Sequence, residues 1–544
     1  MVERKRRLLS AAVLWLIETA VGLLRGVMRA GKLKPLAKSM LEEALSQGHT
    51  SMPLRDLALT ICSQNEGIAE QEVGWALRRL HHQGVITIRG LSASLPHVAQ
   101  SEETIARGLL YVGRDSERVD SRLLTAWIAD QGDRLNNEQR AALSILTTAP
   151  VTILTGGPGT GKTSLIQALT AILEQAKHQV HLAAPTGRAA ARLSEVTNRP
   201  AQTLHRLLYG HSRQRALRHL TQLGEEAIII DEASMLDVFI AARLIKFCTP
   251  RTRLILVGDA DQLPPVQPGQ VFHDLIESGQ IPIVKLTWVY RQAENSVITS
   301  AAREIKAGVV PSLPAPGSTK SDCYFIEADS PAQIKQLVTT AATSSLPKRC
   351  GADPHRNVQV LTPMNEGPLG TRALNKLIRQ SLDRRAARPT SVSVRQAHDF
   401  RPNDRVIQVE NDYELGVFNG ECGIVEEVAE KCVTVGFNGR RVKYTQIQCK
   451  QLSHGYAITI HRSQGSEYPF VIIPIHESHS KMLSRQLLYT ALTRGRQMVV
   501  FIGSQRALTQ AISAQGKRHT GLKDLICATS IQRATAQSVG RSVS

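Results

Sequence analysis

Eight residues constrain this chain more than any others: Gly156-Gly-Pro-Gly-Thr-Gly-Lys-Thr163, with the pattern G-x-x-x-x-G-K-T. The apolar run Val151–Thr155 precedes them and a helical pattern over Ser164–Leu173 follows, so they join a strand to a helix. The glycines let backbone N–H groups converge on phosphate oxygens, and the helix N-terminus adds positive potential. Lys162 is expected on the β- and γ-phosphates of ATP and the Thr163 hydroxyl on Mg²⁺, whereas a glycine-rich turn without a ligand is the alternative. The expected ATP-binding residues of this loop are Gly156, Gly157, Pro158, Gly159, Thr160, Gly161, Lys162, Thr163 and Ser164.

Two further strands end in polar residues that complete such a site. Ala227-Ile-Ile-Ile-Asp231-Glu232 reads as a buried strand that ends in two carboxylates. Asp231 suits a Mg²⁺ ligand, directly or through water, and Glu232 suits a base that orients and deprotonates the attacking water. The next apolar run leads to Gln262, which is placed to sense the γ-phosphate. Because ligands bind at the carboxyl ends of strands in open α/β sheets, these side chains are expected near Lys162 as catalytic groups.

From about Leu135 onward, short apolar runs alternate with helical patterns. This alternation predicts an α/β fold with parallel sheets covered on both faces, and short strand patterns inside the second half predict a small inserted barrel. The expected strands are Val151–Thr155, Val180–Ala184, Ala227–Ile230, Leu254–Val257 and Ile283–Leu286 in the first unit, Val358–Leu361, Phe470–Ile475 and Val499–Ile502 in the second, and Arg405–Val409, Gly423–Val428 and Cys432–Phe437 in the barrel.

The region before this α/β part is mainly helical in pattern. Helices are expected at Leu54–Ile61, Glu70–His82 and Ser121–Ala129, and a short strand at Gly84–Arg89. Helices followed by a strand predict a winged-helix-like unit, and such units either bind DNA or serve as packing modules. At the other end, residues 528–544 are rich in Ser, Ala, Thr and Gln and are expected to be disordered.

The charge balance indicates which class of partner the protein binds. Lys plus Arg is 66 and Asp plus Glu is 47, a net charge of +19, which favours a polyanion such as nucleic acid over a basic surface that binds nothing. The eight cysteines form no C-x-x-C pair, so no zinc or redox site is indicated and a reducing compartment is expected. Glu18 and Arg25 interrupt the apolar N-terminal run, which favours an amphipathic helix over a secretion signal. No stretch reads as a membrane span, and a cytoplasmic protein is expected.

Several motifs follow the phosphate loop in a fixed order. They are Asp231-Glu-Ala-Ser234, Gly258-Asp-Ala-Asp-Gln-Leu-Pro264, Tyr290-Arg-Gln292, His461-Arg-Ser-Gln-Gly-Ser-Glu467 and Tyr489-Thr-Ala-Leu-Thr-Arg-Gly-Arg496. In this order they resemble the motifs of superfamily 1 helicases. The finer spellings resemble the RecD-like branch, at Ala184–Ala190, Thr203–Leu208, Leu361–Met364, Asn411–Tyr413 and Gly416–Gly420. Gly48–Pro53 is similar to a segment that precedes the motor in the stand-alone RecD-type helicases. The resemblance runs from about Leu135 to about Leu525, which is most of the chain.

The resemblance implies two RecA-like domains whose cleft closes and opens with ATP hydrolysis while single-stranded DNA lies across both. It implies that Gln139 contacts adenine, that Glu467 touches the ribose, and that Arg291 and Arg494 reach the γ-phosphate as arginine fingers. Short hydroxyl and imidazole groups suit backbone phosphates, although each of them can also be a helix cap or a satisfied core group. The implied DNA contacts are Thr186, Thr203, His205, Thr362, Asn419, Thr459 and His461.

The chain departs from this family at three places. Only residues 209–226 stand where relatives carry a hairpin before the acidic strand, and this basic segment forms either a small pin that splits the duplex or a solvated loop. Arg462 replaces a lysine that is common in the family. The N-terminal region is shorter than in the longer relatives, so a protein partner is expected there, or a different role.

We therefore expect an ATP hydrolase and DNA helicase that moves 5′→3′ on single-stranded DNA and unwinds duplex at single-strand junctions, in DNA repair or recombination. The direction rests on the resemblance alone. The alternatives are a translocase that does not unwind, an RNA helicase, or a nucleotide-gated DNA-binding subunit of a larger nuclease or mobile-element complex. The expected divisions are a helical N-terminal domain 1–130, a first RecA-like domain 131–285, a second one 286–385 with 455–527, an inserted SH3-like barrel 386–454 and a tail 528–544.

Overall fold

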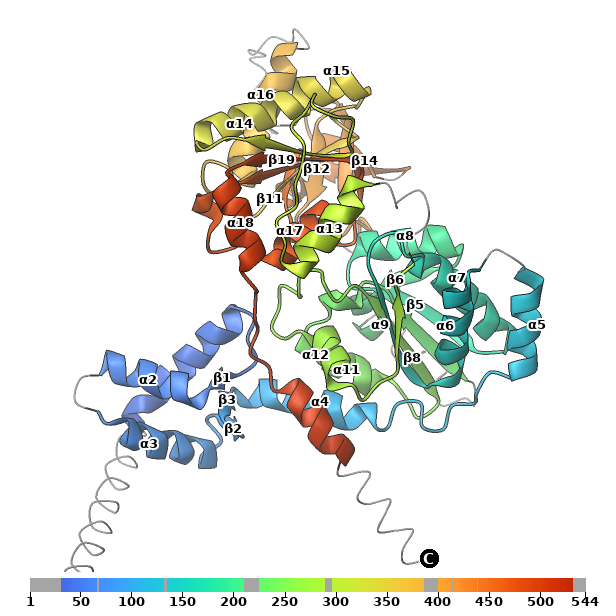
Figure 1. The fold of residues 1–544 in the computed structure, drawn as a ribbon, viewed down its shortest axis with the longest axis vertical. Helices are drawn as coiled ribbons and strands as arrows, with labels where there is room; N and C mark the ends of the chain where they lie inside the picture. The colour runs from blue at the N-terminus through green and yellow to red at the C-terminus, as the bar shows by residue number, and fades with distance from the viewer. Residues whose placement is uncertain are drawn as a thin grey trace, which may run out of the picture.

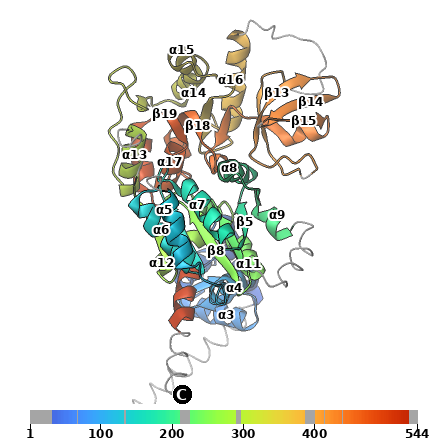
Figure 2. The ribbon, with the colours of Figure 1, turned by 90° about the vertical axis from the view of Figure 1, so that its right-hand side faces the viewer.

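The computed structural model describes residues 31–65, 68–131, 135–209, 225–288, 296–385, 400–412, 414–437 and 439–531. Figure 1 shows two α/β domains, one above the other, and a helical N-terminal unit at the lower left. Figure 2 shows a small antiparallel domain inserted beside the upper one. Within the described ranges, every helix is too short or too polar to span a bilayer.

The first α/β domain is built on a six-stranded sheet in which every neighbouring pair is parallel. The strand order is β6-β5-β7-β8-β4-β9. The five predicted strands are confirmed, and β6 was missed because it has only three residues. The bounds are β4 Val151–Gly156, β5 Gln179–Ala184, β6 Ala201–Thr203, β7 Glu226–Ile230, β8 Thr252–Gly258 and β9 Ile283–Leu286.

Alternate strand residues of this sheet face two separate cores, because side chains along a strand point to opposite faces. In β7, Ala227 and Ile229 join one core, and Ile228 and Ile230 join the other. The first core is covered by α6 Asn137–Thr148, α7 Lys162–Gln175 and α8 Gly187–Thr197, and the second by α4 Pro96–Leu109, α11 Val238–Phe247 and α12 Val271–Ser278. The short helix α9 Leu204–Tyr209 follows β6.

The second α/β domain has a five-stranded parallel sheet in the order β10-β19-β18-β11-β17. The three predicted strands are confirmed. Two were missed: β10 is a half-buried edge strand, and β17 has three residues. The strands are β10 Cys323–Glu327, β11 Val358–Thr362, β17 Ala457–Thr459, β18 Tyr468–Ile475 and β19 Gly495–Gly503. One face of the sheet is covered by α13 Val297–Ala307, α17 Arg485–Leu492 and α18 Gln505–Ser513. The other face is covered by α14 Pro331–Thr340, α15 Leu346–Cys350 and α16 Thr371–Arg385.

The inserted domain is one antiparallel five-stranded sheet with its own apolar core. The strand order is β15-β14-β13-β12-β16, and closure of this sheet into a barrel stays a prediction. The sequence predicted three of its strands and missed the two outer ones. The bounds are β12 Arg405–Gln408, β13 Cys422–Val428, β14 Cys432–Phe437, β15 Arg440–Thr445 and β16 Leu452–His454.

The N-terminal unit begins with a helix over residues 31–46. Then follow β1 Met52–Pro53, α2 Leu54–Gln64, α3 Glu70–His82, β2 Thr87–Arg89 and β3 Ser92–Ser94, and the three strands form an antiparallel sheet in the order β1-β3-β2. The predicted helices are confirmed, with α5 at Ser121–Gln131, whereas the predicted strand is shorter and its partner β3 was not foreseen. The following α4 packs along α11 and so fixes the unit to the first α/β domain.

A C-terminal strap, residues 514–531, leaves the second α/β domain and returns to the first and to the N-terminal unit (Figure 1). The carbonyl of His519 accepts hydrogen bonds from the Thr50 and Ser51 amides at 2.9 and 3.2 Å, and Leu522 and Ile526 enter the shared core. A helix covers residues 522–531. The prediction of disorder from residue 528 was therefore wrong for its first four residues, because burial of Leu522 and Ile526 holds that helix in place. Residues 532–544 lie outside the described ranges.

Candidate active site

The glycine loop leads from β4 into α7 with backbone angles that only glycine adopts freely. Gly159 has φ 73° and Gly161 has φ 81°, where a side chain would be strained. The N-cap residue of α7 is Gly161, which has no side chain to cap the helix, so the first N–H groups of α7 suit a ligand. The Lys162 ammonium donates to the carbonyls of Gly156 and Gly157 at 2.7 and 2.9 Å. These features fit a triphosphate, which would replace the carbonyls as the partner of Lys162.

The two predicted carboxylates lie together at the end of β7. Glu232 has φ 54°, a left-handed conformation that is uncommon for a residue with a side chain. Its amide donates to Asp231 Oδ1 at 2.9 Å. Burial, and next the charge of Glu232, raise the pKa of Asp231 to about 6, while the charges of Lys162 and Arg192 oppose this rise. A bound cation would stabilise the ionised forms of these two neighbouring carboxylates, which fits Mg²⁺ held by Asp231 and the Thr163 hydroxyl.

Gln262 connects the nucleotide side of the first domain to the second domain. Its amide donates to Asp259 Oδ2 at 3.2 Å, and the Tyr489 hydroxyl of α17 donates to the same oxygen at 2.9 Å. Gln262 Oε1 is buried and has no partner among the described residues, so it is available to a ligand. Burial and the charge of Asp259 hold the pKa of Tyr489 far above its usual range, which keeps this hydroxyl a donor.

The main chain after Gln262 makes two more bonds across the same interface. The Leu263 amide donates to Thr490 Oγ1 at 2.9 Å, and the Gln464 amide nitrogen donates to the Leu263 carbonyl at 3.0 Å. Both partners belong to predicted motifs of the second domain. Because β8 pairs directly with the phosphate-loop strand β4, a shift at the nucleotide can reach the second domain through these bonds.

Gln139, the predicted adenine contact, is fully buried at the start of α6. Its side-chain oxygen accepts the Asn136 amide at 3.2 Å and its own amide donates to the Asn136 side chain at 2.7 Å, which is a capping box. Gln139 Nε2 has no partner among the described residues. This N–H group could donate a hydrogen bond to an acceptor atom of adenine.

Two predicted ATP contacts of the second domain are engaged elsewhere. The buried Arg494 guanidinium donates to the carbonyls of Thr490 and Ser466 at 3.2 and 3.1 Å. Both oxygens of Glu467 are paired, with Arg192 at 2.8 Å and with Arg496 at 2.5 Å. Arg291, the other predicted arginine finger, lies outside the described residues.

The predicted DNA-contacting hydroxyls are mostly used inside the fold. Thr186 caps α8 through the Ala189 amide, and the Thr203 and Thr459 hydroxyls accept the amides of Arg206 and Arg462. The fully buried Thr362 hydroxyl donates to the Leu369 carbonyl at 2.7 Å. His205 and Asn419 are exposed, and His461 is half-buried.

Sequence reasoning assigned no role to Arg188 and Arg192, although Arg188 lies in a motif that it singled out. Both extend from α8 to the second domain. Arg188 donates to the Tyr468 hydroxyl at 3.0 Å with its guanidinium 4.9 Å from the ring centroid, and Arg192 pairs with Glu467. The sequence around these two arginines does not show that they face Tyr468 and Glu467, so only the folded chain reveals this interface.

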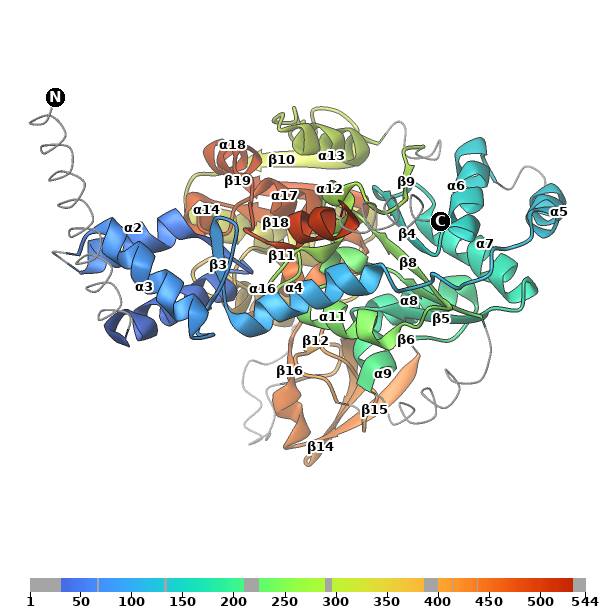
Figure 3. The same cartoon turned by 90° about the horizontal axis from the view of Figure 1, so that it is seen from below.

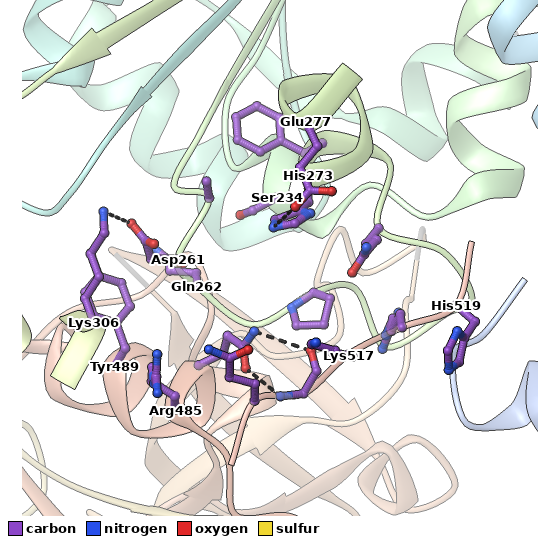
Figure 4. A pocket seen from close by; sticks show the side chains of 18 residues that line it. Ser234, Asp261, Gln262, His273, Glu277, Lys306, Arg485, Tyr489, Lys517 and His519 are labelled. Carbon is purple, nitrogen blue, oxygen red and sulfur yellow. Dashed lines mark hydrogen bonds and ion pairs between the residues drawn. The ribbon is translucent and has the colours of Figure 1, made fainter. Parts of the chain in front are cut away.

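A cavity of about 470 Å³ lies between the domains beside Gln262 and Tyr489 (Figure 4). Lys306, which pairs with Asp261, and Lys517 of the C-terminal strap contribute to its wall. The glycine-loop residues are not among those that line it. It is therefore a space next to the candidate nucleotide site and not the phosphate pocket itself.

Comparison with known proteins agrees with this arrangement. The model of an AAA domain matches residues 134–316, that of the ATP-dependent RecD-like DNA helicase SH3 domain matches residues 374–437, and that of the UvrD-like helicase C-terminal domain matches residues 454–502. Among solved structures, the Pif1 helicase from Bacteroides in complex with ADP-AlF3 and ssDNA has a TM-score of 0.43 and 18% identity, and the match covers 78% of this chain and 98% of that one. A score this low carries no argument about function.

Two curated relatives bear on the family. The ATP-dependent RecD2 DNA helicase of Deinococcus radiodurans is 38% identical over 437 residues, which are 79% of this chain and 58% of that protein. The present chain thus matches little more than half of that relative's length. The RecBCD enzyme subunit RecD of Mycolicibacterium smegmatis is 32% identical over 429 residues, which are 71% of this chain and 74% of that protein. With the ordered motifs and the two parallel sheets, these matches establish that the chain belongs to the RecD-like helicase family.

Proposed function

We propose that this protein is an ATP-dependent DNA helicase that moves 5′→3′ on single-stranded DNA and unwinds duplex at single-strand junctions, in the cytoplasm, during DNA repair or recombination. The observation that supports it most is the bonded path from Asp259 through Gln262 and Leu263 to Tyr489 and Thr490. A motor needs such a path, because hydrolysis must change the relation of the two domains that grip the strand.

The residues of the first domain take these roles. Lys162 leaves its two loop carbonyls for the β- and γ-phosphates, and Gln139 Nε2 faces the adenine. Thr163 and Asp231 would hold Mg²⁺, which supplies charge neutralisation of the phosphates when bound. Glu232 orients the attacking water and accepts its proton, and Gln262 Oε1 reads the γ-phosphate.

The second domain completes the site only when the cleft closes further. Arg494 would exchange its carbonyl partners for the γ-phosphate, and Arg291 would act beside it. Glu467 would exchange Arg192 for the ribose. The pairs seen here would therefore have to break before hydrolysis.

The remaining parts contact DNA or a partner. We propose that Thr186, Thr203, His205, Thr362, Asn419, Thr459 and His461 line the strand's path, the buried hydroxyls acting by shaping the backbone that faces it. The order helix, β1, α2, α3, β2, β3 supports the proposal of a winged-helix-like unit, and the C-terminal end of α3 exposes Arg78, Arg79, His81 and His82. This basic end suits duplex ahead of the motor or a protein partner.

Two assays test the proposal on the full chain. ATP turnover is measured with single-stranded DNA, with RNA and with neither, and the DNA should stimulate it most. Strand displacement is then measured on duplexes with a 5′ or a 3′ tail, and only the 5′-tailed duplex should be unwound. Equal turnover in all three mixtures would refute a DNA motor, and unwinding from 3′ tails would reverse the direction.

A second candidate is a nucleotide-gated subunit of a larger complex. It is favoured by relatives named as RecBCD enzyme subunits, of which this chain matches 74% in one case at 32% identity and 91% in another at 22% identity. In that case the isolated chain binds single-stranded DNA in a nucleotide-dependent way yet displaces no strand. The strand-displacement assay separates the two.

A further inference from the structure

Three side chains form an exposed stack on the first α/β domain. The rings of His205 and Tyr209, both on α9, are nearly parallel, with centroids 5.8 Å apart and planes inclined by 15°. The Arg243 guanidinium carbon, from α11, lies 4.5 Å from the centroid of the Tyr209 ring. Two elements far apart in the chain thus place an imidazole, a phenol and a guanidinium together.

The stack is not part of a core. Leu207 and Leu208 turn the buried face of α9 inward, while Tyr209 keeps 47% of its surface exposed. His205 and Arg243 are exposed as well. Within the described part of the chain Arg243 has no carboxylate partner, and the Tyr209 ring is its one recorded contact. His205 also lies near the Asp237 carboxylate and lowers its pKa, against the larger effect of burial. The exposed side chains nevertheless hold flat groups in register, an arrangement that suits another flat group.

The stack also lies on the side where the strand is expected. Figures 2 and 3 show α9 on the side of the inserted domain, away from α5, α6 and α7. Two of the predicted DNA contacts lie here: Thr203 is the last residue of β6, and His205 is in the first turn of α9. The segment after Tyr209 is the one that stands in place of the family's hairpin.

We propose that His205, Tyr209 and Arg243 form a base-stacking platform for one unpaired nucleobase of single-stranded DNA. This rests on the proposed function. Every base has a π-face, so the platform grips without reading sequence, and Arg243 adds a cation–π interaction with the stacked rings. The threonines suit phosphates, whereas this platform binds the base itself and so fixes the register of the strand on the first domain.

The test measures the affinity of the nucleotide-free full chain for a short labelled oligothymidine by fluorescence anisotropy. Tyr209→Ala should weaken binding on the order of tenfold, because one stacked base is lost. Tyr209→Phe keeps the ring and should bind as the wild type does, and Arg243→Ala should fall between the two. Thermal melting checks that the exposed substitutions leave the fold intact.

An abasic DNA strand keeps the phosphate backbone but has no bases, so it separates base stacking from the other contributions to affinity. On a fully abasic strand of equal length, wild type and Tyr209→Ala should bind equally. The matched control is Tyr111→Ala: Tyr111 is 46% exposed and lies under Arg114 at 4.8 Å, but it belongs to the link after α4. It should leave affinity unchanged.

The outcomes separate the platform from the motor. If wild type binds oligothymidine and Tyr209→Ala binds it equally well, the platform is refuted and the proposed function stands. The same conclusion follows if Tyr209→Ala loses as much affinity for the abasic strand as for oligothymidine. If wild type binds no single-stranded DNA at all, the proposed function fails first.

Discussion

Tyr489 and Asp259 join the two α/β domains through one hydrogen bond of 2.9 Å, made to the same carboxylate oxygen that holds Gln262. Both groups are buried, with exposed fractions of 4% and 1%. A single oxygen therefore links Gln262, the predicted γ-phosphate sensor, to α17, the helix that comes just before the predicted arginine finger Arg494.

Tyr489→Phe should uncouple DNA from hydrolysis. The ring still fills its space, but the bond to Asp259 is lost, and a bond to a charged group is worth about 1.5–3 kcal/mol. We expect DNA-stimulated turnover to fall on the order of tenfold while turnover without DNA changes little. The control is Tyr456→Phe, which removes a Tyr–Asp bond of 3.1 Å to Asp404 outside the cleft. Equal stimulation of the Tyr489 variant and wild type would contradict the coupling role.

Lys162→Ala should abolish ATP turnover without unfolding the protein. Among the described residues, the ammonium donates hydrogen bonds only to the carbonyls of Gly156 and Gly157, so its loss removes little from the fold. Steady-state ATPase assays and thermal melting measure the two effects. Lys285→Ala, an exposed lysine on the neighbouring strand β9, is the control and should keep full turnover. Turnover that survives in Lys162→Ala would sink the phosphate-loop assignment.

Glu232→Gln should bind ATP and fail to cleave it. The amide keeps the size of the side chain and its backbone conformation, but cannot accept the proton of the attacking water. Single-turnover cleavage should drop on the order of a hundredfold or more, while the Kd for ATP stays within a few-fold. Rapid cleavage by this variant would show that another group is the base.

Asp274→Asn should stabilise the protein at high pH and not at low pH. Asp274 is 2% exposed and accepts hydrogen bonds from Gln270 and from Thr520 of the C-terminal strap, while its Oδ2 has no partner in the described part of the chain. Burial raises its pKa from 3.8 to about 7, with the charges of Glu102 and Glu277 adding to the rise. The folded state thus holds a proton that the unfolded chain releases, so stability declines as pH rises from 3.8 towards 7 and is then constant.

The measurement is the melting temperature of wild type and Asp274→Asn across that range. The two should coincide near pH 4 and separate in favour of the variant by about pH 8. Glu277→Gln, on the half-exposed next turn of α12, is the control and should show a smaller separation. A constant difference at all pH values would contradict the titration of Asp274.

Local patterns predicted the nucleotide site well because its residues follow strand ends that the sheet brings to one edge. To place Asp231, Glu232 and Gln262 near the glycine loop, it was enough to predict that β7 and β8 lie in the same sheet as β4. Apolar runs revealed those strands. The short strands β6 and β17 and the edge strand β10 escaped because their hydrophobic runs are too brief or too polar. The predicted DNA-contacting threonines proved to be caps or buried donors, which the sequence alone left open.

The sequence by itself determined the glycine loop, the acidic strand end and the family, since each is written in consecutive residues whose chemistry is local. The tertiary structure alone decided which groups meet across the chain: Asp259 with Tyr489, Arg192 with Glu467, and Tyr209 with Arg243. Such pairs join residues far apart in the chain, and their distances depend on how whole domains pack. No spacing in the sequence records that packing, because it results from the summed burial of two sheets, their helices and a returning C-terminal strap.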